Sequence, residues 1–316
     1  MRRSRIQCDV EGARCRFAVG LINFFGVITE PINHRLFYRI TRQVGNLVDT
    51  ENICVVRLHD DAVYAFHLAD PYWNRLVYRR FRYEHEIYEV LQLVRETPYT
   101  FLDLGANFGF WSVLASSAGL GSHRAIAVEP VARNFAMLSR NCALNDGRFE
   151  IRRAAIASSA CGEVAIRTDP SSLSNVGASI FTSERDGTPS CTERVPALSI
   201  DDLCADEDGD DVPLVIKLDV EGMEIEALKG AKSALNREML LIYEDHGKDP
   251  ACRVTEYVLN LGLRVFHREF RALHEVRHID EVRKIKKQPT KGYNLFACQA
   301  GTKFSTFMSD ACDGRY

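Results

Sequence analysis

The sequence predicts an α/β protein whose mostly parallel sheet carries helices on both faces. From Thr100 onward, short apolar runs alternate with amphipathic helical segments, which is typical of a parallel sheet covered on both sides. Acidic residues and glycines follow the ends of these runs, where ligands bind in such sheets. At 316 residues the chain is long enough for one large domain with an extension.

The N-terminal segment predicts a helix and a hairpin ahead of the sheet. The apolar patch from Phe17 to Ile28 is too short for a membrane span, and acidic residues precede it, unlike in a secretory leader. We interpret it as an amphipathic helix packed on the body of the protein, with membrane-surface contact as the alternative. The β-branched runs at 52–58 and 62–69 flank a polar turn and indicate a β-hairpin.

Residues 70–94 predict one long helix. Asp70 would be its N-cap and Pro71 its first helical residue, with the helical pattern continuing through Val94. The alternative interpretation of "DPYW" (70–73) is an acidic-Pro-aromatic catalytic motif, which we rank below the helix start.

Seven strands and three main helices follow in order. The helices are expected at 110–119, 132–146 and 224–235, and the strands at 101–105, 125–130, 149–157, 213–220, 239–246, 263–268 and 293–299, the last two as an antiparallel pair. A polar insertion occupies 168–196, and the acidic run 204–211 is expected to be a surface loop. The expected organisation is an N-terminal helix and hairpin extension at 1–95, a sheet domain at 96–300 and a tail at 301–316.

Composition bears on partners and location. The 40 basic and 43 acidic residues nearly balance, which argues against a protein held to nucleic acid mainly by phosphate neutralisation. The basic run 283–287 is interpreted as a solvated helix. The ten cysteines include no C-x-x-C pair, which favours reduced thiols in a cytoplasmic protein without stable membrane insertion.

The loop after the first sheet strand predicts a nucleoside site without phosphates. "DLGANFG" has its glycines spaced G-x-x-x-G, so the middle glycine of a dinucleotide fingerprint is replaced by Asn107, and no G-K-[ST] is present. Glu129 follows Gly109 by about twenty residues, the spacing at which a carboxylate meets ribose hydroxyls. A phosphate-free, ribose-bearing ligand points to S-adenosylmethionine, whose amino group would need an acceptor such as Asp103. The predicted cofactor residues are Asp103, Gly105, Ala106, Asn107, Gly109 and Glu129.

Several segments together resemble one known family. "FLDLGANFGFW", "AVEP", "ALSIDDL", "VIKLDVEGMEIEALKGA" and "YNLFA", with "YEHE" (83–86) ahead of them, resemble the FkbM family of methyltransferases over roughly 83–297. The resemblance implies a class I, Rossmann-like three-layer sandwich with an antiparallel last strand. It also implies S-adenosylmethionine as methyl donor and transfer to a hydroxyl oxygen of a small molecule or sugar.

The strand at 213–220 contains the first lysine of an arginine-rich chain. Lys217 and Asp219 are two residues apart, so both side chains point to one face of the sheet. We predict Asp219 as the group that orients or deprotonates the acceptor, Glu221 as the second candidate, and Lys217 as the charge that keeps them ionised. His246 is a further candidate base. The alternative is structural: Asp219 as an N-cap, Glu221 as a first-turn acid, and Lys217 in an ion pair.

Two other classes of function compete with methyl transfer. "HEVRH" (274–278) matches the H-E-x-x-H zinc-peptidase helix with ligands His274 and His278 and base Glu275, but no third histidine follows. We therefore interpret it as a solvent-facing helix and predict no metal site. A binding module that keeps the fold without the activity is the third possibility.

Overall fold

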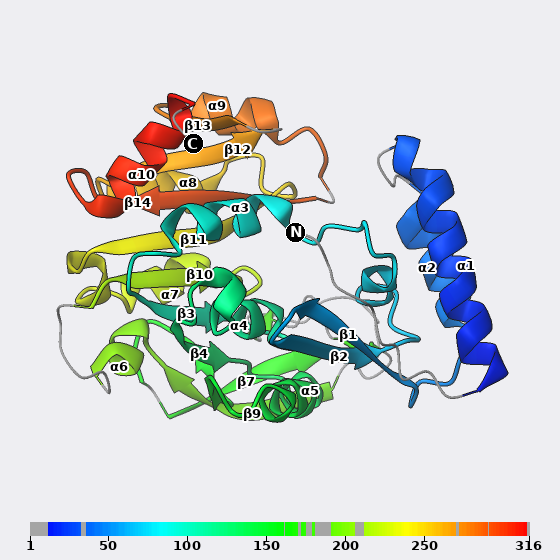
Figure 1. Cartoon of the computed structure of the whole chain (residues 1–316). Coiled ribbons are helices and arrows are strands. Elements are labelled where there is room, and N and C mark those ends of the chain that lie inside the picture. The colour runs from blue at the N-terminus through cyan, green and yellow to red at the C-terminus, as the bar shows by residue number, and fades with distance from the viewer. Residues whose placement is uncertain are drawn as a thin grey trace.

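The computed structural model describes residues 12–32, 36–160, 162–169, 172–174, 179–180, 191–205, 212–269, 272–289 and 291–314. A central sheet has the order β13-β12-β14-β11-β10-β3-β4-β5 in these residues (Figure 1). The five strands from β11 to β5 run parallel, and β14, β12 and β13 are antiparallel to their neighbours. In chain order these strands are β3 (Thr100–Leu104), β4 (Arg124–Val128), β5 (Glu150–Arg152), β10 (Leu214–Leu218), β11 (Met239–His246), β12 (Arg264–Glu269), β13 (Ala272–Val276) and β14 (Gly292–Cys298).

Side-chain alternation along each strand builds two cores, one on each face of the sheet. Leu214, Ile216 and Leu218 of β10 pack into one core, and Val215 packs into the other. Helices cover both faces, so the fold is the three-layer sandwich that the sequence predicts. On the first face lie α6 (Ile200–Ala205), α7 (Glu224–Lys229), α8 (Arg253–Asn260) and α9 (Ile279–Ile285); on the second lie α3 (His85–Val94), α4 (Phe110–Ala115), α5 (Ala132–Leu144) and α10 (Lys303–Cys312).

The N-terminal residues form the predicted helix and hairpin. Helices α1 (Ala13–Thr29) and α2 (Phe37–Gly45) make a layer of their own at the right of Figure 1. Strands β1 (Ile53–His59) and β2 (Ala62–His67) form the antiparallel hairpin, which lies against α4 and α5. No helix in the described ranges is long and apolar enough to cross a bilayer. The cytoplasmic location stays a prediction.

The predicted helix from Pro71 to Val94 is wrong. A short 3-10 turn, η2 (Asn74–Val77), is followed by the extended residue Tyr78, with ψ 109°, and α3 begins only at His85. The hydroxyls of Tyr72 and Tyr83 lie 2.7 Å apart, so the segment folds back on itself instead of continuing as a helix. Glu84, with φ 38°, then starts α3 from a left-handed conformation.

The sheet also has more strands than expected. The seven-stranded prediction misses β13, which pairs with β12 at the edge. The expected third strand at 149–157 is split between β5 and β6 (Ala155–Ile156). The latter joins β7 (Glu163–Thr168), β8 (Ser179–Ile180) and β9 (Cys191–Leu198) of the polar insertion in a second sheet. The acidic run beyond Ala205 falls outside the described residues.

Candidate active site

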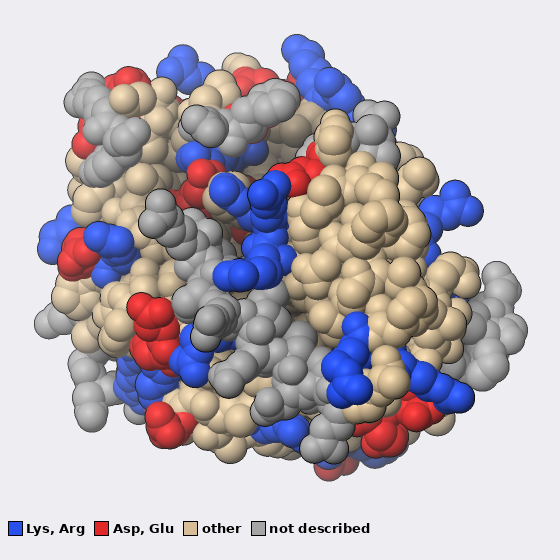
Figure 2. Space-filling view, turned by 45° about the vertical axis from the view of Figure 1, so that its right-hand side comes forward, with Lys and Arg blue, Asp and Glu red and all other residues tan. Residues whose placement is uncertain are grey.

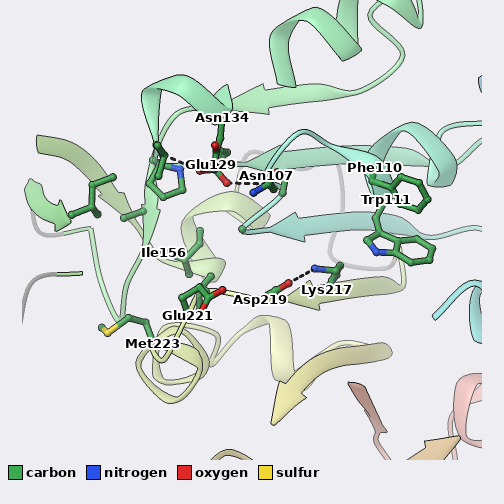
Figure 3. Close-up of a pocket in the computed structure, with 18 of the residues that line it drawn as sticks. Asn107, Phe110, Trp111, Glu129, Asn134, Ile156, Lys217, Asp219, Glu221 and Met223 are labelled. Carbon is green, nitrogen blue, oxygen red and sulfur yellow. Dashed lines mark hydrogen bonds and ion pairs between the residues drawn. The ribbon is translucent and has the colours of Figure 1, made fainter. Parts of the chain in front are cut away.

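A crevice opens at the carboxyl ends of β3, β4 and β10 (Figure 3). The lining comes from the loop after β3, the start of α4, the segment that joins β4 to α5, the turn after β10 and the aromatic segment before α3, with 154–156 and Ile166 beside them. Of the predicted residues, those that line it are Gly105, Ala106, Asn107, Glu129, Lys217, Asp219 and Glu221. Among the described lining residues Lys217 is the only lysine or arginine.

The loop after β3 is held close to the turn after β10. Gly105 has φ 80°, and a Cβ there would lie 1.9 Å from the carbonyl oxygen of Asp219. Asn107 also has a positive φ, 52°. Its side-chain Oδ1 accepts from the Trp73 indole (3.2 Å), and its Nδ2 donates to the Ser174 carbonyl (2.8 Å). The Asn107 side chain is thus used to tie this loop to its neighbours.

Asp103 is buried at the end of β3. Its Oδ2 accepts from the backbone N–H (3.0 Å) and hydroxyl (2.6 Å) of Ser112. Its Oδ1 is buried and has no hydrogen-bond partner in the described part of the chain. Burial raises the pKa of Asp103, while Lys217 and Ser112 act in the opposite direction. A buried acceptor without a donor is an observation that favours a ligand donor at this place.

Glu129 connects the ends of β3 and β4. Its Oε2 accepts from the backbone N–H of Asn107 (2.8 Å), and its Oε1 accepts from Val131 N (3.0 Å) and Asn134 Nδ2 (3.2 Å), as Figure 3 shows for Asn107 and Asn134. Burial raises the pKa of Glu129 to about 7 despite these donors. The carboxylate is therefore fixed at the crevice wall.

Lys217 and Asp219 form an ion pair at the end of β10, with Nζ and Oδ2 3.0 Å apart (Figure 3). Burial disfavours the ammonium, but Asp219, Glu84 and Asp103 outweigh this effect and raise the pKa of Lys217. Asp219 caps no helix, because α7 begins five residues later, at Glu224. The N-cap alternative is therefore wrong, while the ion-pair alternative describes an observed contact.

The turn after Asp219 places a second acid in the crevice. Glu221 has φ 50°, and burial, followed by the charge of Asp219, raises its pKa. The carboxylate of Glu224 accepts from the Gly222 N–H (3.0 Å), which holds the turn that carries Glu221.

Glu84 was not predicted as a site residue from the sequence. Its Oε2 accepts from the Trp111 indole N–H at 2.7 Å, and burial raises the pKa of Glu84 to about 7. Its charge also acts on Lys217. The "YEHE" segment (83–86), which contains Glu84, is part of the family resemblance and could have pointed to this residue.

An aromatic wall was also missed. Tyr72, Trp73, Tyr83, Phe110 and Trp111 line the crevice, with Tyr83 4.9 Å from the Phe110 ring centroid. Asp70 is not the helix cap that "DPYW" predicts: its Oδ1 accepts from Tyr72 N (2.8 Å) within a turn, and the 3-10 turn η2 begins only at Asn74. Two residues of that motif nevertheless belong to the site.

His246 and Glu244 lie at the carboxyl end of β11, the strand beside β10. Their closest atoms, Nδ1 and Oε1, are 3.5 Å apart, and neither residue is among those that line the crevice. Burial raises the pKa of Glu244 to about 9, with Asp219, Glu84 and Glu221 adding to the shift. The acidic residues in and beside the crevice therefore act electrostatically on Glu244, although neither Glu244 nor His246 lines it.

"HEVRH" does not form a metal-binding helix, and the predicted solvent-facing helix is wrong as well. His274 and Glu275 lie in strand β13, whose Leu273 and Val276 are buried in the two cores of the sheet. His278 lies beyond this strand, as the N-cap of α9. The i, i+4 helical spacing that a zinc-peptidase needs is absent. Within the described ranges, no cluster of three histidine, cysteine or acidic residues is placed to hold a metal.

Comparison with known proteins decides the family. The family described as the methyltransferase FkbM domain matches residues 103–279, more than half of the chain. The protein belongs to the FkbM methyltransferase family. The matched region contains Asp103, Glu129, Asp219 and Glu221, and it leaves Glu84 and most of the aromatic wall outside the FkbM domain. No curated protein is detectably similar in sequence.

Solved structures resemble this FkbM protein at low identity. One is methyltransferase FkbM from Methylobacillus flagellatus KT, with 17% identity and TM-score 0.39; the match covers 64% of this chain and 43% of that one. Another is a SAM-dependent O-methyltransferase from Thermotoga maritima, with 14% identity, TM-score 0.35, and coverage of 69% and 66%. A third, described as an rRNA-methylase, comes from Clostridium thermocellum, with 13% identity, TM-score 0.38, and coverage of 70% and 99%.

The sequence-based prediction excluded nucleic acid as a partner, and this exclusion is wrong. Proteins titled as RNA methyltransferases are among those similar to this chain. A near-neutral net charge does not distinguish proteins that bind nucleic acid from those that do not, because a local basic surface can bind phosphates on a protein of balanced composition.

Proposed function

We propose that this protein is an S-adenosylmethionine-dependent methyltransferase that acts on a hydroxyl oxygen of a small molecule or sugar. One observation carries the proposal: the described crevice lining holds three carboxylates, Glu129, Asp219 and Glu221, and a single lysine that Asp219 already pairs. Such a lining disfavours a pyrophosphate and suits a cationic ligand.

We assign the predicted cofactor residues to this ligand, of which Gly105, Ala106, Asn107 and Glu129 line the crevice and Asp103 and Gly109 lie behind its lining. S-adenosylmethionine supplies a methyl group on a positively charged sulfur. We assign the ribose hydroxyls to Glu129 and the ligand's amino group to Asp103, whose Oδ1 needs a donor. Gly105, Ala106, Asn107 and Gly109 shape the loop, and Gly105 must lack a Cβ for the loop to approach Asp219.

The acceptor would be activated at the end of β10. A hydroxyl attacks well only as its proton leaves, so a positioned carboxylate accelerates transfer by about 10²–10⁴. We assign this proton to Asp219, with Lys217 holding the carboxylate in place at 3.0 Å and Glu221 nearby. His246 is the more distant candidate. Tyr72, Trp73 and Tyr83, the part of the aromatic wall that lies in the 1–95 extension, would form the acceptor side of the crevice.

Calorimetry with S-adenosylmethionine tests the cofactor assignment. Binding by the full chain is expected to weaken at least about tenfold in Asp103→Asn and Glu129→Gln, the effect of one lost charge-assisted hydrogen bond. Glu256→Gln, at an exposed position on α8, should bind as the wild type does. Absence of wild-type binding would leave only a scaffold, and preference for NAD would favour a dinucleotide site.

Asp219→Asn tests the acceptor chemistry separately. The variant should bind S-adenosylmethionine nearly as tightly as the wild type, because we assign the ribose to Glu129 and the amino group to Asp103, and neither to Asp219. Transfer of radiolabelled methyl to a panel of polyhydroxylated acceptors should fall by about 10²-fold or more. Full transfer in Asp219→Asn would remove this residue from the mechanism.

A further inference from the structure

Helix α1 buries mostly small residues and exposes several large apolar ones. Its buried positions include Cys15, Ala18, Ile22 and Gly26, while Phe17, Phe24, Val27 and Ile28 are 53–61% exposed. Gly26 permits a close approach, because a Cβ there would lie 2.4 Å from the Tyr78 ring. A helix that is apolar on both faces is normally covered on both. We therefore expect another molecule to cover the outer face of α1.

The exposed apolar side chains are concentrated on this layer. Of the ten large hydrophobic residues that are exposed in the described ranges, seven lie between residues 17 and 47. The other members of this group are Leu36, Tyr38 and Leu47 on and beside α2. Figure 2, which brings this side forward, shows a broad area of uncharged residues bordered mostly by basic side chains, with a few acidic ones at its upper and lower edges.

The charges of the layer have one sign. Exposed Arg14 and Arg16 belong to α1, and exposed Arg39 and Arg42 belong to α2. Neither helix contains an aspartate or glutamate. The acid that follows α1, Glu30, forms an ion pair with Arg80 (3.1 Å).

We propose that α1 and α2 dock on an anionic lipid surface. Phenylalanine and aliphatic side chains on one face with arginines at its border are the signature of a helix that lies in the headgroup region. Anionic headgroups would supply the negative charge that the two helices lack. A second copy related by a two-fold axis fits less well, because a self-complementary contact would bring arginines together without acids from these helices.

Flotation of the full chain with lipid vesicles tests this inference, which does not rest on the proposed enzyme activity. The wild type should float with vesicles of equal parts phosphatidylcholine and phosphatidylglycerol, and much less with phosphatidylcholine alone. The double variant Phe24→Gln/Ile28→Gln should lose at least about tenfold in partitioning, since burial of one large apolar side chain accounts for that much. Arg14→Gln/Arg16→Gln should lose about fivefold or more on the mixed vesicles only.

Leu261→Gln is the matched control, since Leu261 is 38% exposed at the end of α8, on the other face of the sheet. It should float like the wild type, and all variants should keep the wild-type melting temperature because the altered side chains are exposed. Failure of the wild type to float on mixed vesicles, or flotation unchanged in Phe24→Gln/Ile28→Gln, would overturn the proposal. A dimer that Phe24→Gln dissociates, without any vesicle binding, would show that a second copy covers this face.

Discussion

At the scale of single residues, Lys217 is the one cation of the described crevice lining, and it interacts with several carboxylates. It is 5% exposed, pairs with Asp219 at 3.0 Å, and also acts on Glu84 and Asp103. Its pKa is raised by these three carboxylates against the effect of burial. Removal of this one cation would leave three acids close together in a poorly solvated place.

Lys217→Met should therefore lower the free energy of unfolding by about 3 kcal/mol, the cost of leaving a buried charge uncompensated. Urea denaturation measures this value. Lys229→Met is the matched control, because Lys229 and Glu226 form an exposed pair at 2.6 Å. Such a surface pair contributes less than about 1 kcal/mol. Equal losses in the two variants would contradict the central role of Lys217.

Glu244 should make stability depend on pH. Burial, followed by Asp219, Glu84 and Glu221, raises its folded-state pKa to about 9 from the usual 4.5. A carboxyl with a raised folded-state pKa stabilises the fold below its unfolded pKa, and this contribution is lost as the pH rises through the folded pKa.

The melting temperature of the wild type minus that of Glu244→Gln should therefore fall between pH 5 and 9, by roughly 2–4 °C for each 1 kcal/mol lost. Thermal melts followed by circular dichroism across this range measure the difference. Glu256→Gln, an exposed change, should give a flat difference. A flat difference for Glu244→Gln as well would show that the carboxyl is not protonated in the fold.

At the scale of elements, the crevice depends on two loops that touch through a glycine. The Gly105 Cα packs against the carbonyl of Asp219, whose N–H in turn donates to the Leu104 carbonyl (3.0 Å). The loop that we assign to the cofactor and the turn that we assign to the acceptor are therefore in direct contact.

Gly105→Ala should separate these loops. The new Cβ would lie 1.9 Å from the Asp219 oxygen, so we expect a loss of stability well above the strain of positive φ, about 1–2 kcal/mol. Loss of S-adenosylmethionine binding is expected as well. Gly147→Ala is the control, with φ 66° but nothing within 4 Å of its Cβ, and should cost the strain alone without changing binding. Chemical denaturation and calorimetry distinguish the two, and similar results for both would show that the contact is unimportant.

Which elements were predictable follows from how local their signals are. Strands β3, β4, β10 and β11 are apolar runs whose burial depends on composition, and the sequence locates them. The break before α3 is not local: left-handed Glu84 accepts from Trp111, 27 residues later, and Tyr72 contacts Tyr83 across a turn. The loop after β3 and the acids Glu129, Asp219 and Glu221 were predicted because each follows a local strand pattern. Glu84 and the aromatic wall were not predicted, because their places depend on contacts between segments distant in the sequence.

At the scale of the whole molecule, the N-terminal residues and the sheet domain share one core. Residues from α1, α2 and the hairpin pack in the same cluster as Phe101, Val215 and Phe296 of the central sheet. Two side-chain amides, one in α5 and one on its C-cap residue, also pair with the edge of β2. Asn141 bonds Ala65 N (2.7 Å) and Ala65 O (3.0 Å), and Asn145 bonds Val63 N (2.9 Å) and Val63 O (2.7 Å).

Asn141→Ala tests whether this junction joins the two parts. Asn141 is fully buried and also donates to the Phe108 carbonyl (2.8 Å), so its loss leaves three backbone groups without their partner. An unsatisfied buried group costs about 1–3 kcal/mol, which predicts a loss of at least about 2 kcal/mol in one cooperative transition. Asn260→Ala, at the exposed end of α8, should change stability by less than about 0.5 kcal/mol. Urea denaturation followed by tryptophan fluorescence and by circular dichroism would show coincident transitions if residues 12–95 and the sheet unfold together. Two separate transitions, with only the first shifted by Asn141→Ala, would mean that the extension is an independent unit.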